Sequence, residues 1–220
     1  MALLVKSHKS FGDWLKIGKD ITSEQLQKLQ KTVAELVSKG SIDGNLAGLL
    51  VECLGKLGKE AKEDIADLAD DAWEKVMEGM VRAIKKGVAP GWMATALNRT
   101  DIFSASYTRR HFLEDLNKVA DVEGIDRLFS PASMRGSAPG LASSYVSHAE
   151  GALFELQAAA KYVDDQKSIL KLREKIGGGA EEVDIILTDG TFVEVQRGQL
   201  TSAEAKKKIF RNKSAGARQV

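Results

Sequence analysis

The chain has 220 residues, of which 43% are hydrophobic and 29% are charged, a globular balance that excludes wholesale disorder. Its net charge of +1 at pH 7 excludes a strongly basic or acidic protein, although acids gather at 60–78 and bases gather after residue 200. The single cysteine, Cys53, excludes an internal disulfide and a cysteine-based metal cluster.

Neither a membrane span nor a leader is expected from the sequence. The longest apolar run, about 46–54, is too short to cross a bilayer, and the N-terminus lacks the long apolar segment of a signal peptide. We therefore expect no membrane insertion and a cytoplasmic site of action, which the chain could also reach by delivery from another cell.

Residues 1–129 are predicted to form a helical module. One helix opens with a capping box, in which Thr22 is followed by Gln25, and it ends at Gly40. Apolar residues recur at helical spacing in three further segments, 42–58, 62–86 and 106–120. The acids at 60–78 are expected to form a solvated helix face, with docking of a basic partner as the alternative.

A stretch rich in Pro, Ser, Gly and Ala, residues 130–146, is predicted to be a linker to a second domain, 147–220. The second domain is predicted to contain a helix, three strands and a basic helix. Asp189-Gly190 between two apolar runs is a strong signal for a β-hairpin joining the second and third strands. The predicted fold class is therefore α+β, with a helical N-terminal module and a small αβββα(β) domain.

Two acids on this hairpin carry the main chemical signal. Asp184 interrupts an apolar strand, where a carboxylate needs a cation, a hydrogen-bond network or a metal. The hairpin brings Glu194 onto the neighbouring strand, and two carboxylates on one face suit Mg²⁺, whose remaining ligands are often waters. The alternative is structural: Asp184 could be exposed at a strand start, and Glu194 could line the solvated face of an edge hairpin.

The spacing of these acids resembles a known nuclease motif. Asp184, nine intervening residues and then Glu194-Val195-Gln196 look like the core of the PD-(D/E)XK superfamily, which has the restriction-endonuclease-like fold. Glu155, in the predicted helix before the strands, matches the acid that these domains carry on their first helix. The resemblance covers the C-terminal third of the chain and implies an αβββαβ fold.

The resemblance also implies roles for particular residues in a metal-dependent endonuclease. Its catalytic residues would be Glu155, Asp184, Glu194 and Gln196. Its cofactor would be Mg²⁺ or Mn²⁺, held by Asp184, Glu194 and the carbonyl of Val195. Glu155 would orient a metal-bound water or bind a second ion; as alternatives, it could pair with Lys161 or face water.

Gln196 departs from the usual pattern, because most of these enzymes have Lys there. An amide can hold the attacking water through hydrogen bonds but brings no positive charge. Arg197 or Lys161 could supply that charge. Contacts to a nucleic-acid backbone are expected from the following bases: Lys161, Arg197, Lys206, Lys207, Lys208, Arg211 and Lys213. The alternative for the lysine run is a solvated helix face.

Several functions are consistent with this organisation. A helical module, a linker and a small nuclease-like domain are similar to the toxins of contact-dependent inhibition and other polymorphic toxins, which implies an immunity protein as partner. The alternatives are a repair or recombination nuclease that resembles Holliday-junction resolvases, and a degenerate nuclease fold that binds nucleic acid or protein. DNA is favoured over RNA as the substrate, and a homodimer is compatible with the organisation.

Overall fold

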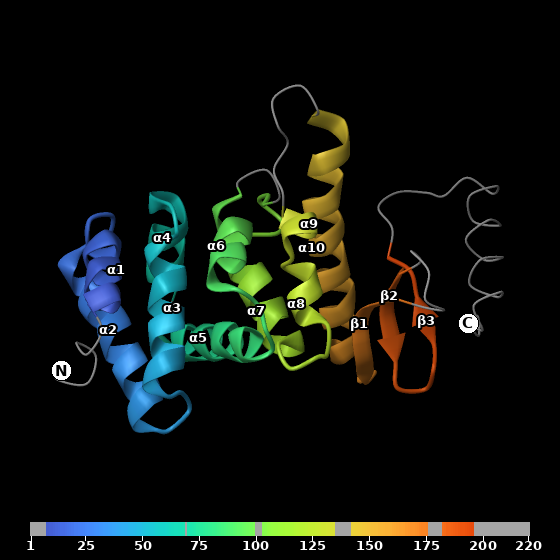
Figure 1. Ribbon diagram of the computed structural model, residues 1–220, viewed down its shortest axis with the longest axis horizontal. Coiled ribbons are helices and arrows are strands. Elements are labelled where there is room, and N and C mark those ends of the chain that lie inside the picture. The colour runs from blue at the N-terminus through green and yellow to red at the C-terminus, as the bar shows by residue number, and fades with distance from the viewer. Residues whose placement is uncertain (1–7, 69, 100–102, 135–141, 176–181, 196–220) are drawn as a thin grey trace.

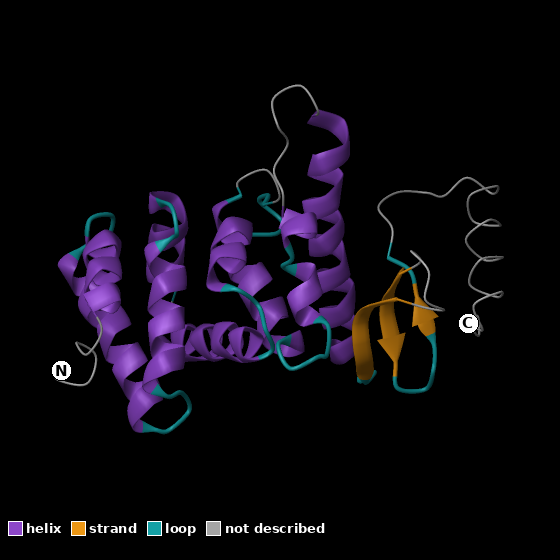
Figure 2. Cartoon of the chain, viewed as in Figure 1, coloured by secondary structure: helices purple, strands orange, loops and turns teal. Residues whose placement is uncertain are grey.

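The computed structural model describes residues 8–68, 70–99, 103–134, 142–175 and 182–195 (Figure 1). This part of the chain is mixed α+β, mostly helical with a small three-stranded antiparallel sheet (Figure 2). The coarse α+β prediction is therefore confirmed. The finer prediction of a restriction-endonuclease-like domain stays a prediction, and its last helix lies outside the described residues.

All of the described helices precede the described strands along the chain. The described helices are α1 (His8–Gly18), α2 (Ser23–Ser38), α3 (Gly44–Gly55), α4 (Lys59–Ala66), α5 (Asp70–Lys85), α6 (Pro90–Asn98), α7 (Arg109–Val119), α8 (Ile125–Leu128), α9 (Pro131–Met134) and α10 (Ala142–Asp164). The described strands are β1 (Ile169–Lys175), β2 (Glu182–Leu187) and β3 (Phe192–Val193).

Local signals in the sequence fix several helix ends. The capping box before α2 is present: Gln25 N–H donates to Thr22 Oγ1 at 3.2 Å, and Thr22 N–H donates to the Gln25 side chain at 2.9 Å. Pro90 occupies the first turn of α6, where its missing N–H costs no helical hydrogen bond. The predicted helix at 62–86 is divided, because α4 ends at Ala66 with Asp67 as its C-cap and α5 begins at Asp70.

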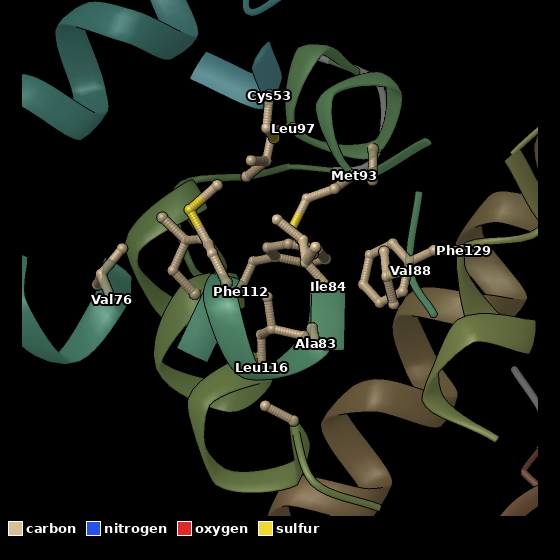
Figure 3. Packing of buried hydrophobic residues seen from close by; sticks show 14 of the residues in the cluster. Cys53, Val76, Ala83, Ile84, Val88, Met93, Leu97, Phe112, Leu116 and Phe129 are labelled. Carbon is tan, nitrogen blue, oxygen red and sulfur yellow. The ribbon is translucent and has the colours of Figure 1, made fainter. Parts of the chain in front are cut away.

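Apolar side chains from the helices form a core that continues to the sheet. Figure 3 shows Met93 and Leu97 of α6 gathered near Phe112 and Leu116 of α7. The Phe112 ring makes edge contacts with Phe103 and Phe129, at centroid distances of 5.9 and 6.0 Å. The same cluster includes apolar residues of α10, β1 and β2.

The predicted domain division, with its linker at 130–146, remains a prediction. Within that stretch the structure describes α9 and the first residues of α10, and Ser133 and Met134 of α9 are buried. Figure 1 shows α10 between the other helices and the sheet. The described helices and the sheet therefore share one continuous core across the predicted boundary.

The sheet is an antiparallel meander in the order β1-β2-β3. Its β2–β3 turn contains Asp189-Gly190, as predicted, and Gly190 adopts a φ of +84°, which glycine tolerates without steric cost. In β1 the register shifts between Ile169 and Lys171, so that Leu170 is an extra residue and β1 bulges.

A close backbone contact joins the sheet to the helices. The Leu172 N–H donates to the Glu123 carbonyl at 2.8 Å, and residues 123 and 171 form a parallel bridge. Gly124 follows with a φ of +89°, and a Cβ on it would lie 2.1 Å from the Leu172 carbonyl oxygen. Only glycine therefore fits at this junction.

Candidate metal centre

The register of the three strands aligns charged residues in one row. Leu172 pairs with Ile185 and Glu174 pairs with Val183, so Arg173 lies opposite Asp184. Ile185 pairs with Val193, so Glu194, one residue after β3, continues the row beyond Asp184. Residues directly opposite in an antiparallel pair have neighbouring side chains. The fold thus places the backbones of the two predicted metal ligands beside each other on neighbouring strands, and it adds an arginine.

Asp184 is half-buried, and its carboxylate is directed towards the end of β3. Its Oδ2 accepts a hydrogen bond from the Val195 N–H at 2.7 Å. This contact joins Asp184 to the residue whose carbonyl was predicted to be a third ligand. Asp184, Glu194 and Val195 therefore lie at one corner of the sheet.

Glu155 lies on α10 and is buried, with 8% of its side chain exposed. Both of its carboxylate oxygens accept hydrogen bonds from one guanidinium: Arg173 Nε donates to Oε2 at 2.6 Å, and Arg173 Nη2 donates to Oε1 at 2.7 Å. This two-pronged geometry is the strong form of an Arg–carboxylate pair. In this arrangement Arg173 is the bonded partner of Glu155, rather than Lys161 or solvent.

The other end of the Arg173 guanidinium is also held. Its Nη1 donates to the hydroxyl of Ser133, and more weakly to the Arg127 carbonyl at 3.4 Å. Glu182 lies 3.7 Å from Nε. Burial disfavours the charged form, but hydrogen bonds and charge from Glu155, together with the charges of Glu182 and Asp184, outweigh it and raise the pKa of Arg173.

The backbone at Arg173 is unusual for a strand. Its φ is +49°, in the left-handed region that a residue with a Cβ rarely adopts. The preceding side chain, Leu172, is fully buried in the core, and Arg173 also reaches the helices through Glu155 and Ser133. Such a conformation costs on the order of 1–3 kcal/mol and persists where surrounding contacts impose it.

A hollow of about 260 Å³ opens beside this row and leads to Arg173. It is lined by Arg127, Arg173, Glu174, Lys175 and Glu182. On its wall, Arg127 Nη1 donates to Glu174 Oε2 at 2.8 Å, and this bond raises the pKa of Arg127 and lowers that of Glu174.

The predicted donor set consists of two carboxylates and one backbone carbonyl. Among the described residues, no group of three or more His, Cys, Asp or Glu side chains is arranged to hold a metal ion. Glu155, the third predicted acid, has both oxygens bonded to Arg173. Asp184, Glu194 and a backbone carbonyl are a ligand set that suits Mg²⁺, which commonly takes one or two carboxylates and keeps several waters.

The remaining predicted site residues fall into two groups. Lys161 is exposed on α10. The others lie outside the described residues, so their predicted roles stay predictions: Gln196, Arg197, Lys206, Lys207, Lys208, Arg211 and Lys213.

Arg173 is the functional candidate that sequence reasoning missed. The available signal was an arginine in the first strand, one strand away from an acid in the second and following a helix with an inward-facing acid. Its partner Glu155 is 18 positions earlier in the chain, and a bulge and a positive φ set the final register. Neither irregularity can be read from alternation in the strand.

Among the described residues, no helix is both long and apolar enough to span a membrane. No protein-family model, no curated protein and no solved structure matches this chain.

Proposed function

We propose that the chain is a metal-dependent nuclease of the PD-(D/E)XK type, with Asp184 and Glu194 as ligands of one Mg²⁺ or Mn²⁺ ion. The observation that carries the proposal is the register, in which a half-buried Asp184 lies opposite Glu194 and beside Val195. Desolvating a carboxylate in a strand among Val183, Ile185 and Ile186 costs free energy, and binding of a cation would offset that cost.

When bound, the ion would polarise a phosphate oxygen and lower the pKa of a coordinated water. The protein's share is to hold this corner in place. Asp184 is oriented by the Val195 N–H, which donates to its Oδ2 at 2.7 Å. Gln196, by its position in the motif, would hold the attacking water through hydrogen bonds.

The proposed substrate is a nucleic acid, with DNA favoured over RNA. The exposed Lys161 and the basic residues after 195 would contact the phosphate backbone independently of sequence. On the organisational resemblance, the chain would be the toxic part of a toxin–immunity system that acts in the cytoplasm, with an immunity protein as partner. A repair or recombination nuclease is the alternative within the same chemistry.

One observation favours a second candidate, a degenerate nuclease fold that binds nucleic acid without cleaving it. The acid that would help to activate water, Glu155, is neutralised by Arg173, and Gln196 replaces the usual Lys. Such a module would retain binding to DNA or RNA and would have no metal-dependent cleavage.

Cleavage assays separate the two candidates. We expect the purified chain to cleave plasmid DNA or RNA with Mg²⁺ or Mn²⁺ and not with EDTA. Asp184→Asn and Glu194→Gln should each lower the rate by roughly a hundredfold or more, because each removes a charged ligand. Asp165→Asn is the matched control, since Asp165 is exposed just after α10 and should leave the rate unchanged.

The nuclease proposal is wrong if neither metal supports cleavage, or if both site variants cleave as fast as the wild type. Retained DNA binding in a gel-shift assay, without cleavage, would then support the binding module.

A further inference from the structure

The position of the Arg173 guanidinium points to a property of the proposed site. Three carboxylates act on this one cation: Glu155 through two hydrogen bonds, Glu182 at 3.7 Å, and Asp184 from the opposite position on β2. Glu194 continues the row beyond Asp184. The guanidinium is thus a fixed positive charge between the helix acid and the strand acids.

The pair is costly to build, which argues against a chance surface contact. Only 15% of the Arg173 side chain and 8% of the Glu155 side chain are exposed. Desolvating two charges in this way is often no more stabilising than apolar packing. The backbone of Arg173 in addition holds a positive φ. Strained backbone at a charged, partly buried cluster is typical of functional sites.

We propose that the Arg173 guanidinium takes the place of a second divalent cation, so that the site binds a single metal ion at Asp184 and Glu194. This inference rests on the nuclease function proposed above. Arg173 is then a positioning residue. It occupies both carboxylate oxygens of Glu155, which therefore cannot bind an ion, and it supplies positive charge where a second ion would lie. Unlike an ion, this charge cannot dissociate or be chelated.

The number of bound ions tests the inference directly. Mn²⁺ titrations of the purified chain, followed by the electron paramagnetic resonance signal of free Mn²⁺, should give one ion per wild-type chain. The double variant Glu155→Gln/Arg173→Met removes both charges and should still bind one ion, because it keeps Asp184, Glu194 and the net charge of the site. Asp184→Asn should weaken binding by about tenfold or more.

Arg173→Met alone should expose the carboxylate of Glu155 to solvent ions and raise the number of bound Mn²⁺ to two. Its thermal midpoint should also rise more on addition of Mn²⁺ than that of the wild type, because ion binding stabilises only the folded chain. If this single variant does not fold, as judged by circular dichroism, the number of Mn²⁺ ions bound by the double variant tests the inference instead.

Two ions on the wild type, or loss of Mn²⁺ binding in the double variant, would overturn the role of Arg173 while leaving the nuclease proposal intact. A wild type that binds no Mn²⁺ would instead contradict the proposed metal site itself, and with it this inference.

Discussion

Two arginines that pair with acids, one among the helices and one at the sheet, are embedded in different ways. Arg109 of α7 is 5% exposed, and its acidic partners Glu60 and Asp64 are 67% and 48% exposed. At the sheet, Glu155 is buried, with 8% of its side chain exposed, and its partner Arg173 is partly buried, with 15% exposed. In the helical part the cation is covered and water reaches the acids, whereas at the sheet the acid is covered as well.

This difference separates a structural clamp from a candidate site. Arg109 joins α7 to α4 and also donates to the Leu97 carbonyl at 2.7 Å, with its guanidinium 5.1 Å from the ring centre of Phe103. These contacts join α7 to α4, to α6 and to the segment between α6 and α7. Glu155 and Arg173 instead form a neutral pair beside two further carboxylates, and that arrangement sets the charge available to a ligand.

The first prediction concerns removal of each cation. Arg173→Met should lower the free energy of unfolding by about 3–5 kcal/mol, because it leaves a buried carboxylate unpaired. Arg109→Met should cost less, about 2 kcal/mol, because water can solvate Glu60 and Asp64 once the cation is gone. Urea denaturation measures both values.

Adding Glu155→Gln to Arg173→Met should recover at least half of the lost stability. Equal losses in the free energy of unfolding for the two arginine variants, or no recovery in the double variant, would contradict the proposed difference between the two ion pairs.

The second prediction concerns the junction between the two regions. Gly124→Ala should lower stability by about 3 kcal/mol, because the new Cβ would meet the Leu172 carbonyl oxygen at 2.1 Å and the residue has a positive φ. Gly151→Ala in α10 is the matched control, since a Cβ there meets nothing within 4 Å and alanine favours a helix by up to about 1 kcal/mol. A junction that tolerates Gly124→Ala would mean that the sheet moves freely against the helices.

The third prediction concerns a titratable group buried in the helical part, the thiol of Cys53. Burial raises the pKa of the Cys53 thiol to about 12, with Lys56 opposing this shift and Glu52 adding to it. At pH 8 the folded chain should therefore react with a thiol reagent about a hundredfold more slowly than the urea-unfolded chain.

The pH dependence of stability follows from the same shift. Between the ordinary thiol pKa, near 9, and about 12, the unfolded chain loses a proton that the folded chain keeps, so this contribution to stability falls as pH rises through that window. Rapid reaction of native Cys53 at pH 8 would contradict its burial.

Local signals predicted the local parts of this fold. The capping box at Thr22 and the Asp189-Gly190 turn each act within a few residues, and both are present. The broken helix at 62–86 was not predicted, because apolar spacing continues in phase from α4 into α5. The pairing of Glu155 with Arg173 also escaped prediction, since it depends on how α10 packs against β1.

The candidate site divides in the same way. The sequence could predict that Asp184 and Glu194 lie on neighbouring strands, because a tight turn fixes the hairpin register. The bulge at Leu170 and the positive φ of Arg173 have no sequence signature, so the cation beside these acids became visible only with the tertiary fold.

The bridge between Glu123 and Lys171 has a consequence for assembly. A strand at the border of a sheet offers unpaired N–H and C=O groups, onto which another chain can add a strand. Here the Glu123 carbonyl occupies the Leu172 N–H, a 3.1 Å ion pair joins the Lys171 and Glu123 side chains, and the Leu170 bulge bends the same strand. The middle of β1 is thereby protected from edge-to-edge aggregation. Among the described strands, β3 forms the other edge of this sheet, next to Asp184 and Glu194.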